Sequence, residues 1–282
     1  MRLNPFEPGS IKVGRGGGGF PGGGGGQLGC GAIVIALIGA VVFGVDPGQM
    51  LGTMDSMQQG APSDQRGGET AAEICDDNRY ATEACNALGS LNRTWEPAFA
   101  QAGIPFEQPT LWFYTGGTRS GCGAASSSVG PFYCPADYGI YLDTSFYDTM
   151  ERQLGAGGDF ARYYVIAHEY GHHIQALTGV ADAIRSAQQR SPQQANQLQV
   201  LMELQADCYA GVWAGKNRNL IEPGDFEEGM TAASAIGDDA LTQGRVSPEN
   251  FTHGTSQQRM QALRLGMESA DDTQCDRIVE IG

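Results

Sequence analysis

A pair of histidines four residues apart is the feature that most constrains how this chain folds. Residues 167–173 read AHEYGHH, and this stretch holds three of the four histidines of the 282-residue chain. On a helix, residues i and i+4 are offset by about 40° and about 6 Å, so the imidazoles of His168 and His172 can reach one point. The spacing therefore predicts a helix that carries two metal ligands, with the carboxylate of Glu169 beside them.

Two imidazoles on one helix make half of a tetrahedral zinc site, and the glutamate of H-E-x-x-H can act as a general base on water. His173 is rotated by about 140° from His168, so we expect it to pack beside the site rather than bind the metal. The alternative is a polar helix whose histidines are satisfied by ordinary hydrogen bonds. We predict one zinc ion per chain, held by His168 and His172, with Glu169 as the base.

A catalytic zinc needs a third protein ligand and one open position. The extended pattern with a glycine and a third histidine is excluded, because those positions hold Gln175 and Thr178. Glu203 and Asp207, in ELQADCYA, share one face of a second expected helix, amid apolar neighbours where charges need partners. We assign Glu203 as the third ligand and Asp207 as the acceptor of a hydrogen bond from a ligand histidine. Spacing alone also permits the reverse assignment.

The stretch FTHGTSQQR contains the fourth histidine, His253, and an arginine, Arg259. We predict that His253 donates a hydrogen bond to the oxyanion of a reacting carbonyl; the alternative is that it organises the loop before a helix. Arg259 is predicted to form a structural ion pair with one of three acids: Glu203, Asp207 or Asp238. We expect Asp238 near a helix C-terminus, where negative charge is unfavourable, and so expect it to have a partner, arginine in preference to calcium.

The first 69 residues differ in composition from the rest of the chain. Residues 1–27 contain a glycine run and are predicted to be a flexible cytoplasmic tail, and residues 46–69 a linker. The uncharged residues 28–45 would span about 27 Å as a helix, close to the thickness of a bilayer core, and are predicted to be a transmembrane anchor. Basic residues precede the anchor, which predicts a cytoplasmic N-terminus and a periplasmic or extracellular domain. A cleaved signal peptide is the alternative.

Charge and cysteine content restrict the partners and the compartment. The net charge of −15 argues against nucleic acid as a partner. Six of the seven cysteines follow the apolar segment, and an oxidising compartment would let them pair. Six cysteines allow 15 connectivities. Closeness in sequence suggests the pairs Cys75–Cys85 and Cys122–Cys134, which leaves Cys208 with Cys275; buried free thiols are the alternative.

The pattern of residues 70–282 is that of one α+β domain. Helical spacing is expected in residues 70–103 with a break at Gly89, and in 160–177, 193–214, 226–241 and 256–265. Asp225 with Glu228, and Thr255 with Gln258, are expected to cap the last two of these helices. Aromatic and β-branched runs in residues 110–147 predict a small, mostly antiparallel sheet, whose edge could receive a substrate peptide.

HEYGHHIQ followed by ELQADCYAGVWA resembles the neutral zinc metallopeptidases, a family of membrane-anchored bacterial proteins. FYCPADYGIYLDTSF and the block ending in FTHGTSQQR are also similar to that family, and the likeness covers about residues 72–276. A more distant similarity is to membrane gluzincins such as the HtpX heat-shock proteases and the CaaX prenyl proteases. The resemblance implies a zincin-like, mainly helical fold and peptidase chemistry, and it favours Glu203 over Asp207 as the ligand.

The function predicted from these features is zinc-dependent hydrolysis of peptide bonds by an endopeptidase, with a peptide or protein as the substrate. The alternative is a zincin-fold module that binds envelope proteins or peptides without cutting them. Every residue type of the motif is present, so the sequence shows no sign that catalysis has been lost.

Overall fold

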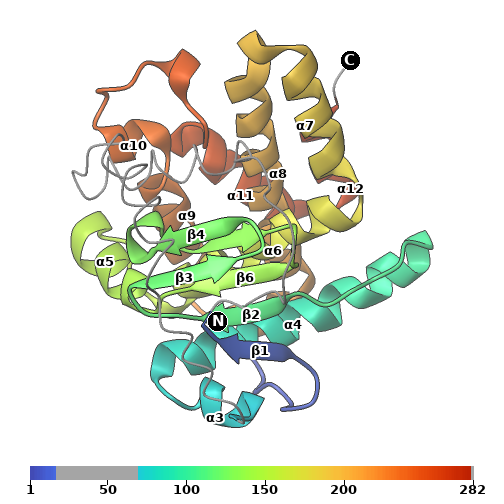
Figure 1. Cartoon of the computed structure of the whole chain (residues 1–282), viewed down its shortest axis with the longest axis vertical. Helices are drawn as coiled ribbons and strands as arrows, with labels where there is room; N and C mark the ends of the chain where they lie inside the picture. The colour runs from blue at the N-terminus through green and yellow to red at the C-terminus, as the bar shows by residue number, and fades with distance from the viewer. Residues whose placement is uncertain (17–68, 281–282) are drawn as a thin grey trace.

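The computed structural model describes residues 1–16 and 69–280, in which helices surround a small sheet (Figure 1). The helices are α3 (Ala71–Cys75), α4 (Arg79–Ala102), α5 (Ser145–Leu154), α6 (Asp159–Leu177), α7 (Val180–Arg190), α8 (Ala195–Lys216), α9 (Asp225–Ala235), α10 (Asp238–Thr242), α11 (Ser256–Ser269) and α12 (Thr273–Asp276). The strands are β1 (Lys12–Arg15), β2 (Thr110–Phe113), β3 (Gly117–Ser120), β4 (Gly123–Ser126), β5 (Phe132–Cys134) and β6 (Gly139–Leu142). Mixed helices and strands confirm the predicted α+β class.

The main sheet has the strand order β1-β2-β6-β5, and β3 pairs with β4 in a separate hairpin. The pairs β1–β2 and β2–β6 are parallel, and only β5–β6 is antiparallel. The prediction of a mostly antiparallel sheet holds for two of the three strand pairs within residues 110–147, but the main sheet, which also contains β1, is mostly parallel. The cause is that β1 comes from the N-terminal segment, and that the chain crosses over between β2 and β6 instead of turning back directly.

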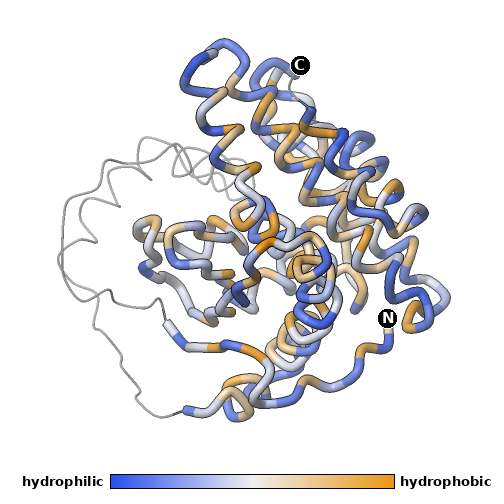
Figure 2. The backbone as a smooth tube through the Cα atoms, turned by 90° about the vertical axis from the view of Figure 1, so that its right-hand side faces the viewer, coloured by the Kyte–Doolittle hydropathy of each residue, from blue (hydrophilic) through white to orange (hydrophobic). Residues whose placement is uncertain are grey.

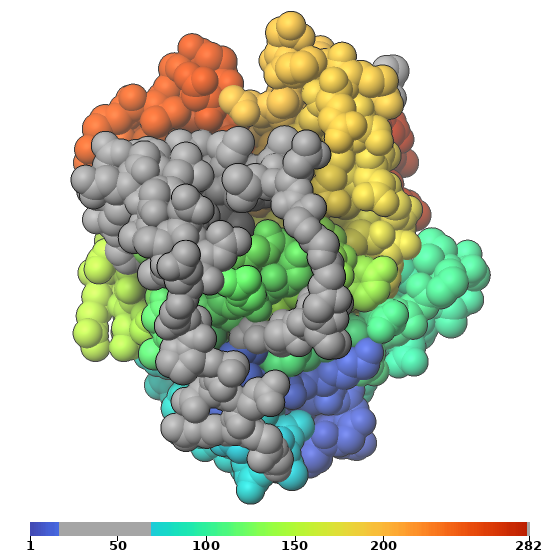
Figure 3. Space-filling model, in the orientation of Figure 1, coloured from blue at the N-terminus to red at the C-terminus, as the bar shows by residue number. Residues whose placement is uncertain are grey.

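Residues 1–16 belong to the folded domain, so the prediction of a flexible tail is wrong for them; residues 17–27, and residues 46–68 of the predicted linker, lie outside the described residues. β1 lies beside β2, and Figure 3 shows this N-terminal segment in blue against the cyan of α3 and α4. Ile11 is buried, and Phe6 and Ile11 approach α4 at Gly89, where a Cβ would lie 3.4 Å from Phe6. Gly89 thus lies inside an unbroken α4, and the helix break occurs between Cys75 and Arg79 instead.

The pairing of β1 with β2 also bears on the predicted membrane topology. The predicted anchor, residues 28–45, lies outside the described residues. Across residues 1–16 and 69–280, the structure has no helix of the length and apolarity needed to span a bilayer. A single crossing between residues 16 and 69 would put β1 and β2 on opposite sides of a membrane. The prediction of a cytoplasmic N-terminus with the domain outside is therefore incompatible with this sheet.

The core lies between the sheet and the helices, around α4, α6 and α8. Figure 2 shows orange apolar stretches alternating with blue polar ones along the chain. All three predicted disulfides are present: Cys75–Cys85, Cys122–Cys134 and Cys208–Cys275. α6, α8 and α11 begin and end close to the predicted boundaries. Thr255 and Gln258 form the expected capping box of α11.

The predicted helix 226–241 is two helices, α9 and α10, which are separated at Gly237. This glycine lies against the start of α11, where a Cβ would be 2.3 Å from the backbone nitrogen of Ser256. The predicted cap by Asp225 and Glu228 is wrong, since Gly224 occupies the cap position. Asp225 instead accepts from the backbone N–H of Glu222 at 2.5 Å, and Glu228 accepts from the backbone N–H of Phe160 at 3.0 Å.

Candidate metal centre

Two close helix contacts determine the geometry of the candidate site. α6 and α8 meet at Gly171, where a Cβ would lie 2.8 Å from the Cα of Ala206. α8 and α11 meet at Gly211 and Gly266, where a Cβ on Gly266 would lie 2.0 Å from the carbonyl oxygen of Cys208. Glycine lets the backbones approach where any side chain would clash. Polar side chains from three helices can therefore converge on one buried point.

The three predicted ligands converge there. His168 and His172 lie on α6 and Glu203 on α8, and one ligand atom from each lies within 4.8 Å of the others. Oε2 of Glu203 is 3.2 Å from Nε2 of His168 and 3.4 Å from Nε2 of His172. Bonds of about 2.0–2.1 Å around a tetrahedral zinc require ligand atoms about 3.3 Å apart. The donor set and its spacing fit a zinc ion.

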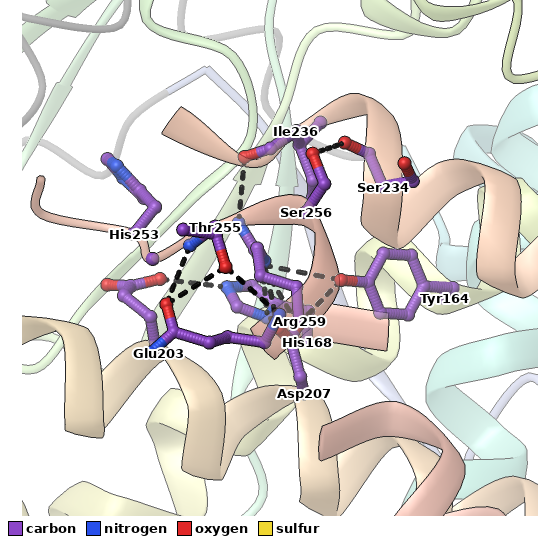
Figure 4. A network of polar contacts seen from close by, with 12 residues as sticks. Tyr164, His168, Glu203, Asp207, Ser234, Ile236, His253, Thr255, Ser256 and Arg259 are labelled. Atoms are coloured by element: carbon purple, nitrogen blue, oxygen red, sulfur yellow. Dashed lines mark hydrogen bonds and ion pairs between the residues drawn. The ribbon is translucent and has the colours of Figure 1, made fainter. Parts of the chain in front are cut away.

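His168 is held from behind by a charged cluster. Nδ1 of His168 lies 2.7 Å from Oδ1 of Asp207, which also accepts from the hydroxyl of Tyr164 at 2.6 Å. The guanidinium of Arg259 donates to both oxygens of Asp207, at 2.8 and 2.9 Å (Figure 4). Asp207 and Arg259 are almost wholly buried, so each charge depends on the other. Of the three acids considered for Arg259, Asp207 is the partner.

The electrostatics of this cluster keep Asp207 ionised. Burial alone raises the pKa of its carboxyl, but Arg259 and His168 outweigh burial and lower the pKa to about 2. A carboxylate that stays ionised accepts a hydrogen bond from Nδ1–H of His168, so Nε2 of that ring is the atom that faces Glu203 and could bind a metal.

The other two predicted ligands have neutral partners. Nδ1 of His172 lies 2.9 Å from Oε1 of Gln175. Oε1 of Glu203 accepts from the side-chain amide of Gln199 at 2.8 Å. Sequence reasoning missed both glutamines, as well as Tyr164. The available signal was their spacing, three or four residues from a ligand on the same helix, which places them next to it.

Glu169, the predicted base, is buried beside the two histidines. Burial raises the pKa of its carboxyl above the usual value, and this effect exceeds the opposing influence of His168 and His172. Within residues 1–16 and 69–280, its carboxylate has no hydrogen-bond partner in the protein. It is thus placed to accept a proton from a molecule that enters the site.

His253 lies in the loop before α11 and is anchored by Asp238. Oδ2 of Asp238 accepts from the backbone N–H groups of Thr252, His253 and Gly254, at 2.7, 2.6 and 3.1 Å. Its Oδ1 is 3.2 Å from Nδ1 of His253. In Figure 4, His253 lies near Glu203 and has no dashed contact with the residues drawn.

The partner predicted for Asp238 was an arginine or a calcium ion, and this is wrong. Asp238 lies in the first turn of α10, at the helix end where negative charge is favoured. The hydrogen bonds from the loop backbone and from His253 lower the pKa of its carboxyl, against the effect of burial. Asp238 therefore organises the loop that carries His253.

His173 is fully buried and faces away from the ligands, as its helical position predicts. Its Nε2 lies 2.7 Å from the carbonyl oxygen of Glu107, and its Nδ1 lies 3.0 Å from the hydroxyl of Tyr133 on β5. Burial lowers the pKa of this imidazole to about 4, so the ring is neutral at pH 7. His173 thus connects α6 to the edge strand of the sheet.

A second group of acids, at the start of α6, is Asp159, Asp225 and Glu228. The amino group of Met1 lies 2.6 Å from Asp225 and 3.1 Å from Asp159, and Glu228 accepts from the backbone N–H of Phe160. These contacts within the protein account for the group.

The chain is similar to bacterial proteins along most of its length. The chain is 46% identical over 270 residues to a protein of Escherichia coli (strain K12) named "Uncharacterized protein YpfJ", covering 93% of this chain and 90% of that one. It is 38% identical over 257 residues to "Uncharacterized protein Rv2575" of Mycobacterium tuberculosis (strain ATCC 25618 / H37Rv), covering 84% of each chain. No solved structure matches it. A family model described as "Putative neutral zinc metallopeptidase" matches residues 8–278, and the chain belongs to this family.

Proposed function

We propose that the protein is a zinc-dependent endopeptidase whose metal ligands are His168, His172 and Glu203. The observation that carries the proposal is the spacing of their ligand atoms, which matches the edges of a tetrahedral zinc site, with a buried carboxylate beside it. A zinc ion bound there would polarise a peptide carbonyl and lower the pKa of water.

The residues of the chain perform the proton transfers. Glu169 accepts the proton of the attacking water and delivers it to the nitrogen of the leaving amine. Nothing in the described residues hydrogen-bonds its carboxylate, so the carboxylate is available for both steps. His253, oriented by Asp238 near Glu203, donates a hydrogen bond to the oxyanion that develops on the scissile carbonyl.

The substrate is a peptide or protein that adds to the edge of the sheet. β5 is an edge strand, and Tyr133 on it is joined to α6 through His173. An extended peptide pairing with this edge uses backbone hydrogen bonds, which tolerate many sequences. The three disulfides favour an oxidising compartment for the reaction.

Substitution of Glu169 by glutamine separates metal binding from catalysis. We expect the purified Glu169→Gln protein to hold one zinc per chain, as the wild type does. It should not cleave a mixed peptide library, and mass spectrometry of the peptides detects any cleavage. His168→Ala is the matched variant that should lose the zinc. Cleavage by Glu169→Gln at the wild-type rate would refute the assignment. Peptide binding without cleavage by the zinc-loaded wild type would instead support a binding module.

A further inference from the structure

The hydrogen bonds of Gln175 determine which way its side-chain amide points. Its Nε2 lies 2.7 Å from the backbone carbonyl oxygen of Met202. A carbonyl oxygen only accepts hydrogen bonds, so the NH₂ group of Gln175 must be the part that faces it. The same NH₂ group donates to Oε1 of Gln205 at 2.9 Å. Both amide hydrogens of Gln175 are therefore used, and its oxygen is directed at His172.

The amide orientation in turn determines that a hydrogen lies on Nδ1 of His172. Oε1 of Gln175 is an acceptor, so Nδ1 of His172, 2.9 Å away, carries the hydrogen. The neutral ring then has its lone pair on Nε2, the atom that lies 3.4 Å from Glu203. A metal ligand must present a lone pair, so this tautomer is the one that can bind.

We propose that Gln175 is a positioning residue for the metal centre, which selects the Nε2-binding tautomer of His172 and fixes the plane of its ring. This inference rests on the proposed zinc site. It assigns a role to the position at which the extended three-histidine pattern would have a glycine. The helix α6 thus supplies two ligands, the base and the partner of one ligand within eight residues.

Gln205 and the C-terminal segment support Gln175 in turn. The amide nitrogen of Gln205 lies 3.5 Å from Oδ1 of Asp276, which also accepts from the hydroxyl of Tyr209 at 2.9 Å. Asp276 follows Cys275, whose disulfide with Cys208 holds this segment against α8. The effect of a substitution on zinc binding should therefore decrease in the order Gln175, Gln205, Asp276.

The test measures zinc affinity of the full-length protein by competition with a chromophoric chelator. We expect Gln175→Met, which keeps the size and removes the amide, to weaken zinc binding by about 10- to 100-fold. Gln205→Met should have a smaller effect, and Asp276→Asn the smallest. Gln197→Met is the matched control, because Gln197 is an exposed glutamine on α8. The melting temperatures of the zinc-free proteins show whether a variant is simply less stable.

A spectroscopic signal separates positioning from general destabilisation. With only four histidines in the chain, the hydrogen-bonded Nδ1–H groups of zinc-loaded, ¹⁵N-labelled protein can be assigned by NMR. Gln175→Met should lose the downfield Nδ1–H signal of His172 through solvent exchange and keep that of His168. Unchanged affinity and signal in Gln175→Met, or equal losses in Gln197→Met, would refute the inference. Failure of the wild type to bind zinc would instead refute the proposed function.

A second inference comes from the contacts of the N-terminal segment. β1 pairs with β2 along four residues, and the backbone N–H of Gly16 continues the ladder to Phe113 at 2.8 Å. The backbone N–H of Phe6 donates to the side chain of Asn86 at 2.9 Å. Arg15 forms ion pairs with Glu69 at 3.1 Å and Asp77 at 3.2 Å. Both acids lie near residue 69, where the second described range begins.

We infer that residues 1–16 lie in the same compartment as the domain formed by residues 69–280. The paired strand, the buried Ile11 and the ion pairs of Arg15 cannot coexist with a membrane between β1 and β2.

Single cysteines test this in intact cells. In a Cys30→Ser background, Gly9→Cys and Gln197→Cys each place a thiol at an exposed position, one in the N-terminal segment and one in the domain. A membrane-impermeant maleimide should label both variants or neither. Labelling of one with protection of the other would refute the inference, provided that both react after detergent lysis.

Discussion

His168 and His172 lie on one helix and face the same point, yet the Nδ1 atom of each ring has a different kind of hydrogen-bond partner. His168 rests on a buried carboxylate that is paired with an arginine, whereas His172 rests on a neutral amide. The charged support joins α6, α8 and α11, since Asp207 and Arg259 come from the last two. The neutral support stays within α6 and α8. Both partners fix the tautomer of a histidine, but the Asp207–Arg259 pair beside His168 also holds three helices together.

The physical consequence is a difference in what each support costs when it is broken. A buried ion pair that loses one partner leaves an uncompensated charge in a low-dielectric interior, whereas a lost amide leaves only unpaired hydrogen bonds. Variants at the charged support should therefore affect folding and metal binding together. Variants at the neutral support should affect metal binding more than folding.

The largest effect is expected for Asp207→Ala. It leaves Arg259 buried without a counter-charge, which should lower the free energy of unfolding by about 3–5 kcal/mol. Urea denaturation of the zinc-free protein measures this loss. Replacing both partners, as Asp207→Ala with Arg259→Met, should restore part of the stability, and a double variant no more stable than Asp207→Ala would contradict the ion-pair explanation.

Tyr164→Phe comes next, because it removes the hydrogen bond to Asp207 and the longer one accepted from Arg259 at 3.3 Å, and leaves the ion pair intact. A hydrogen bond to a charged group contributes about 1.5–3 kcal/mol, so the free energy of unfolding should decrease by an amount in this range. The same denaturation experiment applies. Tyr163→Phe is the control and should change stability less. Tyr163 is the neighbouring tyrosine of α6, and its hydroxyl forms no hydrogen bond within the described residues.

Gln199→Met tests whether a neutral support also matters for the carboxylate ligand. Loss of the hydrogen bond to Oε1 of Glu203 should weaken zinc binding by about tenfold, with little change in folding, because no charge is left unpaired. Chelator competition measures the affinity. A loss of stability as large as that of Asp207→Ala would remove the distinction between the two kinds of support.

The smallest effect on zinc is expected at the third histidine of the cluster. Both ring nitrogens of His173 are used by Tyr133 and Glu107, away from the ligands. His173→Gln should leave zinc affinity unchanged and, by loosening β5, raise KM for peptides more than it lowers kcat. Loss of zinc in this variant would show that His173 takes part in the metal site, contrary to its position on the helix.

Much of the site could be predicted because local geometry decides it. The four-residue spacing of His168 and His172 brings two rings to one point on any helix, and the acids of ELQADCYA are paired in the same way. Two disulfides were predicted from closeness in sequence and the third as the remaining pair, and the structure has the same three. The neutral supports were not predicted, since Gln175 has meaning only beside Met202 and Gln205 of another helix.

The sequence by itself predicted the helix with His168 and His172 and the pair of acids near them, because these depend on periodicity and residue type, but spacing left open which acid is the third ligand. Only the tertiary structure decided that Arg259 pairs with Asp207 and that Asp238 binds its own loop. It also decided that residues 12–15 form a parallel strand beside β2. Such contacts join segments far apart in the chain, and no local pattern specifies which of several acids or strand edges a segment will meet.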